Sequence, residues 1–292
     1  ALVWKTRGRQ FDSASGHKLI KKLIYKFQNK ELKKYIFWKL GVYNKESEVF
    51  NTKRFNYSNN SIELRKYINT KHNYDGILLD LFVSPDSKNF VNKWHHYLPI
   101  YENYFSAYLD KNINFLEIGV ADGGSLEMWS KYFSKNSKIY GIDINEECKK
   151  YENENIKVFI GDATDSRFLK DNIFTSVNYF DIILDDGSHK MEDIKQSLIN
   201  LYPKLKVGGL YIIEDLHTSY WPKFNGGINK KDNFFNYIKN IIDDMHFDFH
   251  KHGDYKTIVK DSGYGLHIYN SLVIIEKREK LDIKFSNTKF IN

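Results

Sequence analysis

Short apolar runs alternate with amphipathic stretches from about residue 95 to the end of the chain. The runs are at most seven residues long, are rich in Ile, Val, Leu, Phe or Tyr, and stand close to Gly, Asp or Asn, which is typical of buried strands. A later pair of runs is expected to close the sheet. The predicted strands are Asn114–Val120, Lys138–Ile144, Ile156–Gly161, Phe180–Leu184 and Gly209–Glu214, with Gly265–Tyr269 and Ser271–Lys277 as the closing pair.

The amphipathic stretches between these runs predict helices. Strands that alternate with helices specify a parallel sheet with right-handed crossovers. We therefore predict an α/β fold, a doubly wound, Rossmann-like, mostly parallel sheet with helices on both faces. The predicted helices are 124–134, 146–153, 164–173, 190–204 and, after a glycine-containing loop, 228–250.

The first 75 residues follow a different pattern. Residues 17–41 carry apolar side chains at helical spacing and end at Gly41, a suitable C-cap, so we predict a helix there. Residues 43–75 are polar and rich in Asn and Ser, which indicates a loop or linker with at most one short helix. We place a domain boundary near residue 75, between a basic helical arm (1–75) and the α/β domain (76–292).

The composition is that of a globular protein. Hydrophobic residues make up 41% of the 292 residues and charged residues 28%, with 21 Tyr, 21 Phe and only 4 Pro, which excludes a disordered chain. The one cysteine, Cys148, excludes a disulfide scaffold or a Cys-cluster zinc site and fits a reducing compartment. No run reaches the ~18 apolar residues of a membrane span. The first residues show no signal-peptide pattern, so we expect a cytoplasmic location.

The formal net charge of +7 is unevenly distributed. Residues 1–75 hold 17 of the 44 basic and 6 of the 37 acidic residues, a net +11, which leaves −4 for the remainder. A basic arm suits nucleic acid, anionic headgroups or phosphorylated substrates, but also a solvated lysine-rich helix face. Because the remaining domain is acidic, we expect no nucleic-acid partner. We leave peripheral membrane contact open, and we expect a homo-oligomer.

The loop after the first strand is rich in glycine. Glycines let the backbone approach a ligand closely, and the following helix directs free N–H groups toward it. The spacing Gly-x-x-x-Gly-Gly differs from the Gly-x-Gly-x-x-Gly pattern of dinucleotide sites. The candidate ligand-binding residues of this loop are Glu117, Gly119, Val120, Gly123 and Ser125.

Acidic residues also end the next two strands. Ligands of such sheets bind beyond the carboxyl ends of the strands, where Asp143 suits ribose hydroxyls and Asp162, before Ala163, suits an adenine amino group. Each Asp alone also suits a turn or a helix cap. Together with Glu117, they would repel phosphates and favour a cationic adenosine ligand.

These motifs resemble the class I S-adenosylmethionine-dependent methyltransferases over roughly residues 93–277. The resemblance implies S-adenosylmethionine as cofactor, its methionine part over the glycine loop, and its ribose and adenine on Asp143 and Asp162. Tyr97, Ala163 and Asp185 complete the implied cofactor contacts. Tyr97 lies in the stretch Lys93–Tyr101, which resembles a family segment that packs over the cofactor. The matching stretches are 115–124, 140–143, 161–163 and 180–186.

Carboxylates gather where the fourth and fifth predicted strands end. If these strands are neighbours, their ends lie about 5 Å apart, and Asp186, Glu214 and Asp215 converge. Three carboxylates in a dry crevice require a cation. Mg²⁺ (or Mn²⁺), which takes oxygen ligands, would meet that need. The alternative is that these acids cap the helix near Lys190 or end a solvated strand.

His189 follows Asp186 by three residues. A lone histidine is usually structural or on the surface, but one beside a metal ligand suits a general base near neutral pH. We predict that His189 and Asp186 are catalytic and that His189 removes the acceptor proton before in-line attack on the sulfonium methyl.

The stretches 185–189 and 208–221 together resemble the metal-dependent sugar O-methyltransferases. That family includes macrolide-sugar enzymes of the mycinamicin and macrocin type and relatives labelled cephalosporin hydroxylase-like. Position by position, the resemblance implies Mg²⁺ on Asp186, Glu214 and Asp215, with His189 as base. The aromatic segment 217–227 is placed to line the acceptor pocket. The candidate acceptor residues are His217, Tyr220, Trp221, His267 and Tyr269.

The predicted activity is therefore S-adenosylmethionine- and Mg²⁺-dependent O-methylation of a sugar hydroxyl. The acceptor would be a nucleotide-activated sugar, a polysaccharide precursor or a glycosylated natural product, and the basic arm favours an anionic, nucleotide- or lipid-linked one. The alternatives are a catechol or phenol O-methyltransferase, a nucleic-acid methyltransferase and a non-catalytic nucleoside-binding scaffold. A hydroxylase is set aside, because no 2-His-1-carboxylate spacing is evident.

Overall fold

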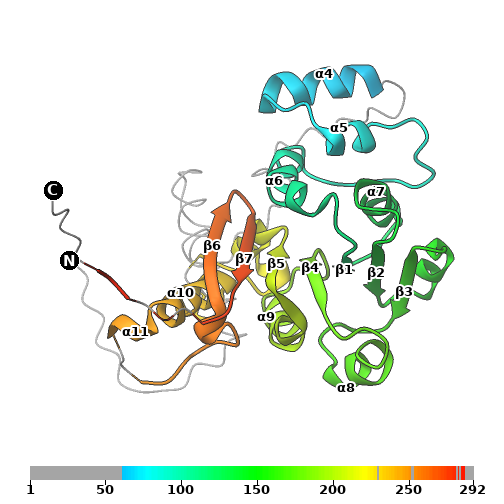
Figure 1. The fold of residues 1–292 in the computed structure, drawn as a ribbon. Helices are drawn as coiled ribbons and strands as arrows, with labels where there is room; N and C mark the ends of the chain where they lie inside the picture. The colour runs from blue at the N-terminus through cyan, green and yellow to red at the C-terminus, as the bar shows by residue number, and fades with distance from the viewer. Residues whose placement is uncertain (1–60, 229, 251–252, 281, 283, 287–292) are drawn as a thin grey trace, which may run out of the picture.

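The computed structural model describes residues 61–228, 230–250, 253–280, 282 and 284–286 (Figure 1). The predicted helix at 17–41 and most of the basic arm lie outside these residues. The boundary near residue 75 stays a prediction.

The described residues form one seven-stranded sheet in the order β3-β2-β1-β4-β5-β7-β6. The first five strands along the chain are parallel, and β7 runs antiparallel to both of its neighbours. Continuous apolar runs form these strands because parallel strands are buried on both faces. The strands are β1 Asn114–Ile118, β2 Lys138–Asp143, β3 Ile156–Ile160, β4 Phe180–Asp185, β5 Leu205–Ile213, β6 Gly263–Tyr269 and β7 Leu272–Lys277.

The strand order reverses between β1 and β4, and ligands of doubly wound sheets bind at such a point. The register pairs Ile118 with Asp185, and Asp185 with Ile213, so the carboxyl ends of β1, β4 and β5 are level. The residues that follow these three strands are therefore brought together at one edge of the sheet.

Helices cover both faces of the sheet, each over its own core (Figure 1). One core lies with α9 and α10 and includes Leu198 and Ile241; the other lies with α5, α6 and α7 and is built around Trp129. The predicted fold class is confirmed. The helices are α4 Ser61–His72, α5 Ile77–Phe82, α6 Tyr97–Phe105, α7 Gly124–Tyr132, α8 Ser166–Phe168, α9 Met191–Leu201, α10 Phe234–Met245 and α11 Phe247–His250, with a 3-10 helix at Glu146–Tyr151 and a π-helical turn at Leu169–Ile173.

Several predicted elements differ in their bounds from the structure. The predicted helix 228–250, for example, is observed as α10 and α11, which begin at Phe234 and Phe247. The short helix that we allowed within 43–75 is α4, which is twelve residues long and whose Ile68 joins the α5–α7 core. The strand predicted at Gly209–Glu214 begins earlier in the structure, at Leu205, and the register of β5 with β4 shifts between Phe180 and Ile182. Gly208, at φ 85°, lets the strand pass through that irregularity.

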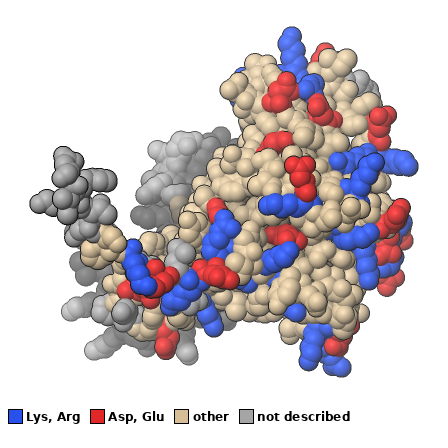
Figure 2. All heavy atoms as spheres, viewed as in Figure 1, with Lys and Arg blue, Asp and Glu red and all other residues tan. Residues whose placement is uncertain are grey.

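Positive and negative side chains are interspersed over the described part of the surface in Figure 2. Within the described residues, no helix has the length and apolar character needed to cross a bilayer.

Candidate active site

The β1–α7 loop is shaped by glycine and by Asp143. Gly119 has φ 90°, and a Cβ there would lie 2.2 Å from the carbonyl oxygen of Asp186. The backbone N–H groups of Val120 and Ala121 donate to Oδ2 of Asp143 at 2.9 and 3.1 Å, and that of Asn145 donates to Oδ1 at 2.8 Å. The Asp143 carboxylate therefore holds the glycine loop and the end of β2 in place.

A cavity of about 270 Å³ opens beyond the carboxyl ends of β1, β2, β3 and β4. Asp185 in its wall is buried, and its Oδ2 has no partner within hydrogen-bond distance among the described residues. Burial raises the pKa of this carboxyl to about 7. Among the predicted cofactor residues, Gly119, Asp143, Asp162, Ala163 and Asp185 line this cavity, as does the predicted catalytic Asp186.

The deep wall of the site holds a lysine among carboxylates. Lys93 Nζ lies 2.6 Å from Asp186 Oδ2, 2.6 Å from Glu214 Oε1 and 3.1 Å from Glu117 Oε1. Burial opposes the charge on Lys93, but attraction to Asp186, Glu214 and Glu117 overcomes it and holds the pKa of Lys93 well above its usual range. Tyr101 donates a hydrogen bond to the same Glu214. Burial and the neighbouring carboxylate of Asp186 raise the pKa of Glu214.

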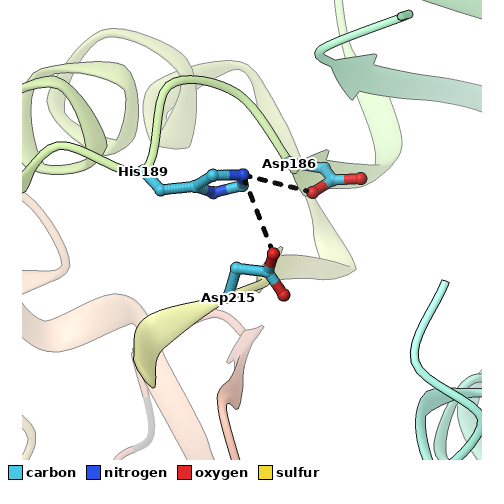
Figure 3. Close-up of side chains that lie close together, drawn as sticks. All are labelled: Asp186, His189 and Asp215. Carbon is cyan, nitrogen blue, oxygen red and sulfur yellow. Dashed lines mark ion pairs between the residues drawn. The ribbon is translucent and has the colours of Figure 1, made fainter. Parts of the chain in front are cut away.

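A second, more open cluster shares Asp186 with the first and consists of Asp186, His189 and Asp215 (Figure 3). His189 Nε2 is 3.7 Å from Asp186 Oδ1 and 3.9 Å from Asp215 Oδ2, and the ligand atoms of all three lie within 4.8 Å of one another. The imidazole points between the two carboxylates in Figure 3. His189 and Asp215 both adopt left-handed backbone conformations, at φ 58° and 55°, a strained geometry that is common at functional sites.

Asp215 is fixed by residues that precede the sheet. Its Oδ1 accepts from Trp94 Nε1 at 2.9 Å and from the Tyr97 hydroxyl at 3.0 Å, which leaves Oδ2 facing His189. Tyr97 is thus a neighbour of Asp215 and is absent from the lining of the cavity beyond the strand ends. Its predicted contact with the cofactor stays a prediction.

The structure divides the predicted metal-binding set. Asp186 and Asp215 face each other across His189, whereas Glu214 faces Lys93 and Tyr101. Within the predicted glycine-loop set, Glu117 accepts from Ser125 Oγ at 2.7 Å. It belongs to the buried group of Lys93, Glu117, Asp186 and Glu214, which we call the deep cluster.

Two of the predicted acceptor residues, His217 and Trp221, form part of an aromatic wall. The ring of His217 packs edge-on against Trp94 at 5.7 Å and Trp221 at 4.7 Å, and Phe224 lies 6.3 Å from the ring of His189. Tyr220 packs against Phe235.

The other two predicted acceptor residues are on β6, which β7 separates from β5. His267 is hydrogen-bonded to Glu276, and Tyr269 to Tyr104. The structure therefore does not bring these two together with His189.

From the sequence, Lys93, Trp94 and Tyr101 were placed only in a stretch expected to pack over the cofactor, whereas all three contact the predicted acids. They come from the segment before β1 and from α6. The signal in the sequence was the negative charge at the strand ends, which requires a cation. We considered only a metal ion as that cation and did not consider a lysine.

Residues 116–216 match a protein family described as a methyltransferase domain. The chain is 33% identical over 204 residues to 8-demethyl-8-alpha-L-rhamnosyl tetracenomycin-C 2'-O-methyltransferase of Streptomyces olivaceus, covering 64% of this chain and 52% of the relative. It is 34% identical over 214 residues to demethylmacrocin O-methyltransferase of Streptomyces fradiae, covering 65% and 51%. The chain thus spans about half the length of these curated relatives.

Among solved structures, the chain resembles the MycE methyltransferase of the mycinamycin biosynthetic pathway in complex with Mg and SAH. The TM-score is 0.63 and the identity 30%, over 72% of this chain and 56% of that one. The strand order, the glycine loop and the acidic strand ends agree with these matches. Residues 116–216 therefore carry a methyltransferase domain, and the sheet around it has the fold of the class I S-adenosylmethionine-dependent methyltransferases.

Proposed function

We propose that this chain transfers a methyl group from S-adenosylmethionine to a hydroxyl of a sugar on a small-molecule acceptor, with the help of Mg²⁺ or Mn²⁺. The observation that carries the proposal is the position of Asp186. It lines the cavity beyond the strand ends and also faces His189 beside Asp215. A methyl donor in the cavity would therefore be next to a base and two carboxylates.

The cavity fits the adenosine cofactor because carboxylates that accept hydrogen bonds line it. S-adenosylmethionine, when bound, supplies a methyl group on a sulfonium that needs no further activation. A carboxylate has about four acceptor positions, and three of those on Asp143 are taken by backbone N–H groups, so one remains for the ribose. The unpartnered Oδ2 of Asp185 offers a further buried acceptor.

Asp186 and Asp215 fit a hard divalent cation, because both present carboxylate oxygens at a partly exposed position. Such an ion, when bound, makes an alcohol easier to deprotonate. His189 would accept the proton of the acceptor hydroxyl, and the two carboxylates would stabilise the resulting imidazolium. Trp94 and Tyr97 hold Asp215 in orientation for this role.

A sugar acceptor is supported by the relatives, which are named for methylation of sugar hydroxyls on polyketide glycosides. The aromatic wall of Trp94, His217 and Trp221 is suited to the apolar face of a sugar ring. The preference of the basic arm for an anionic acceptor rests on residues outside the described part of the chain and stays a prediction.

The test combines binding with turnover. S-adenosylhomocysteine is titrated into EDTA-treated protein by calorimetry, and Mg²⁺, labelled methyl donor and a panel of glycosides and sugar nucleotides are then added. We expect micromolar binding and a methyl transfer that EDTA abolishes. Transfer that ignores EDTA would remove the metal from the proposal, and transfer only to catechols would replace the sugar. Failure to bind S-adenosylhomocysteine would contradict the assigned cofactor cavity.

A further inference from the structure

The deep cluster has the spacing of a metal site but holds an amine. Oxygen atoms of Glu117, Asp186 and Glu214 lie within 4.8 Å of one another, and Lys93 Nζ is within hydrogen-bond distance of all three. The Lys93 side chain is 1% exposed. An ammonium group has three donors, so the three carboxylates use its full capacity.

We propose that Lys93 is a built-in cation that takes the place of a metal ion between Glu117, Asp186 and Glu214. Glu214 then positions Lys93 and does not bind a metal. A divalent ion would be held in the open cluster, by Asp186 and Asp215. The part that concerns the divalent ion rests on the proposed function; the part that concerns Lys93 does not.

Charge is the first argument for this role. Buried carboxylates at this spacing repel one another and require a counter-charge. The remaining contacts are also made by the chain itself, since Ser125 donates to the second oxygen of Glu117 and Tyr101 donates to Glu214. The chain itself therefore supplies one positive charge among the three carboxylates and further hydrogen-bond donors to Glu117 and Glu214.

The two oxygens of Asp186 give the second argument. Oδ2 accepts from Lys93, while Oδ1 faces His189 in the open cluster. Lys93 thereby sets the orientation in which Asp186 presents its free oxygen. It also connects the ends of three strands, β1 through Glu117, β4 through Asp186 and β5 through Glu214.

Melting temperatures of the full chain in EDTA test the counter-charge. We expect Lys93→Met to lower the melting temperature by about 10 °C, because removing one partner of a buried ion pair is strongly destabilising. Adding Glu117→Gln to Lys93→Met should restore part of that loss, since one uncompensated charge is removed. Lys206→Met, which removes a surface partner of Asp181, is the matched control and should change it by less than about 2 °C. Equal effects of the two lysine substitutions, or no recovery with Glu117→Gln, would overturn the role of Lys93.

Manganese binding, followed by electron paramagnetic resonance, tests the role of Glu214 and does not require a lysine variant. We expect Glu214→Gln to keep the Mn²⁺ dissociation constant within about threefold of the unsubstituted chain and Asp215→Asn to raise it at least tenfold. Equal weakening by both substitutions would make Glu214 a ligand and overturn this part of the inference. If the unsubstituted chain binds no Mn²⁺, the metal of the proposed function is wrong, and the melting temperatures alone decide the role of Lys93.

Discussion

At the scale of single residues, the surroundings of His189 suit the role of a general base that we propose for it. Its Nε2 lies between two carboxylates, its backbone is held in a left-handed conformation, and its side chain is partly exposed. A structural histidine would be expected to make a short hydrogen bond, whereas the distances here are 3.7 and 3.9 Å. Nε2 makes no short hydrogen bond to either carboxylate, so it remains available to accept a proton from a substrate hydroxyl.

Replacing His189 by Ala should lower kcat by about 10² to 10⁴-fold, because general-base catalysis contributes on that order. Binding of S-adenosylhomocysteine should change little, since His189 is not in the cavity lining. Initial rates with labelled methyl donor and calorimetry check the two parts. His246→Ala, at an exposed histidine near the end of α10, is the control and should behave like the unsubstituted chain. A rate loss explained entirely by weaker cofactor binding would contradict the role of base.

Asp185 predicts a pH dependence of stability. Burial raises the pKa of this carboxyl to about 7, above the 3.8 of an ordinary Asp. The folded state then binds a proton that the unfolded state releases between about pH 4 and pH 7, so the contribution of Asp185 to stability falls as the pH rises through that window. We expect Asp185→Asn to raise the melting temperature relative to the unsubstituted chain at pH 7.5, by about 5 °C, and much less at pH 4.5. The same difference at both pH values would contradict the shifted pKa.

At the scale of elements, the β1–α7 loop and α6 position the site. The loop crosses the end of β4 so closely that only glycine fits at position 119. Helix α6 brings Tyr97 to Asp215 and Tyr101 to Glu214, one turn apart on the same face. One loop thus forms the floor of the cofactor cavity, and one helix orients the two acids that follow β5.

Gly119→Ala should weaken S-adenosylhomocysteine binding by more than tenfold, because the new Cβ would meet the Asp186 carbonyl at 2.2 Å and displace the loop. Gly253→Ala is the matched control. Gly253 also has a positive φ, of 79°, but a Cβ there meets nothing within 4 Å, so it measures backbone strain alone. Calorimetric dissociation constants for the two variants separate the clash from the strain. Equal affinities would show that the loop can move aside.

At the scale of the whole molecule, the charge is divided between the first 75 residues and the rest of the chain. The excess of basic residues lies in the segment of which the structure describes only the end, and the described surface in Figure 2 shows both signs interspersed. If the acceptor is anionic, this division would raise its local concentration near the site.

Neutralising Lys21, Lys22, Lys26 and Lys30 with Gln should raise the KM for an anionic, nucleotide-linked sugar several-fold at low salt and leave the KM for a neutral glycoside unchanged. Steady-state kinetics at two ionic strengths provide the measurement, because the effect should shrink as salt screens the charges. An unchanged KM for the anionic acceptor would contradict this use of the basic arm.

The sheet was predictable from the sequence because strands buried on both faces are continuous apolar runs bounded by turn residues. Phe180–Leu184 is such a run and is observed as Phe180–Asp185. Helix α4 could be predicted only as one short helix without a position within 43–75, because its sequence, SIELRKYINTKH, is mostly polar and buries only Ile68. Such a helix is stabilised by packing against its neighbours rather than by its own periodicity.

By itself, the sequence determined the α/β class, the edge of the sheet at which the cavity lies and the acids at the strand ends. These follow from local patterns, since hydrophobic period and turn chemistry act over a few neighbouring residues. Only the tertiary structure decided how those acids are grouped. Lys93 lies 24 residues from Glu117, 93 from Asp186 and 121 from Glu214, so no local pattern links them. Their meeting depends on the strand order and on the path of one irregular segment across three strand ends. That path decides that Glu117 and Glu214 face an ammonium group, that Asp215 faces His189, and that Asp186 faces both.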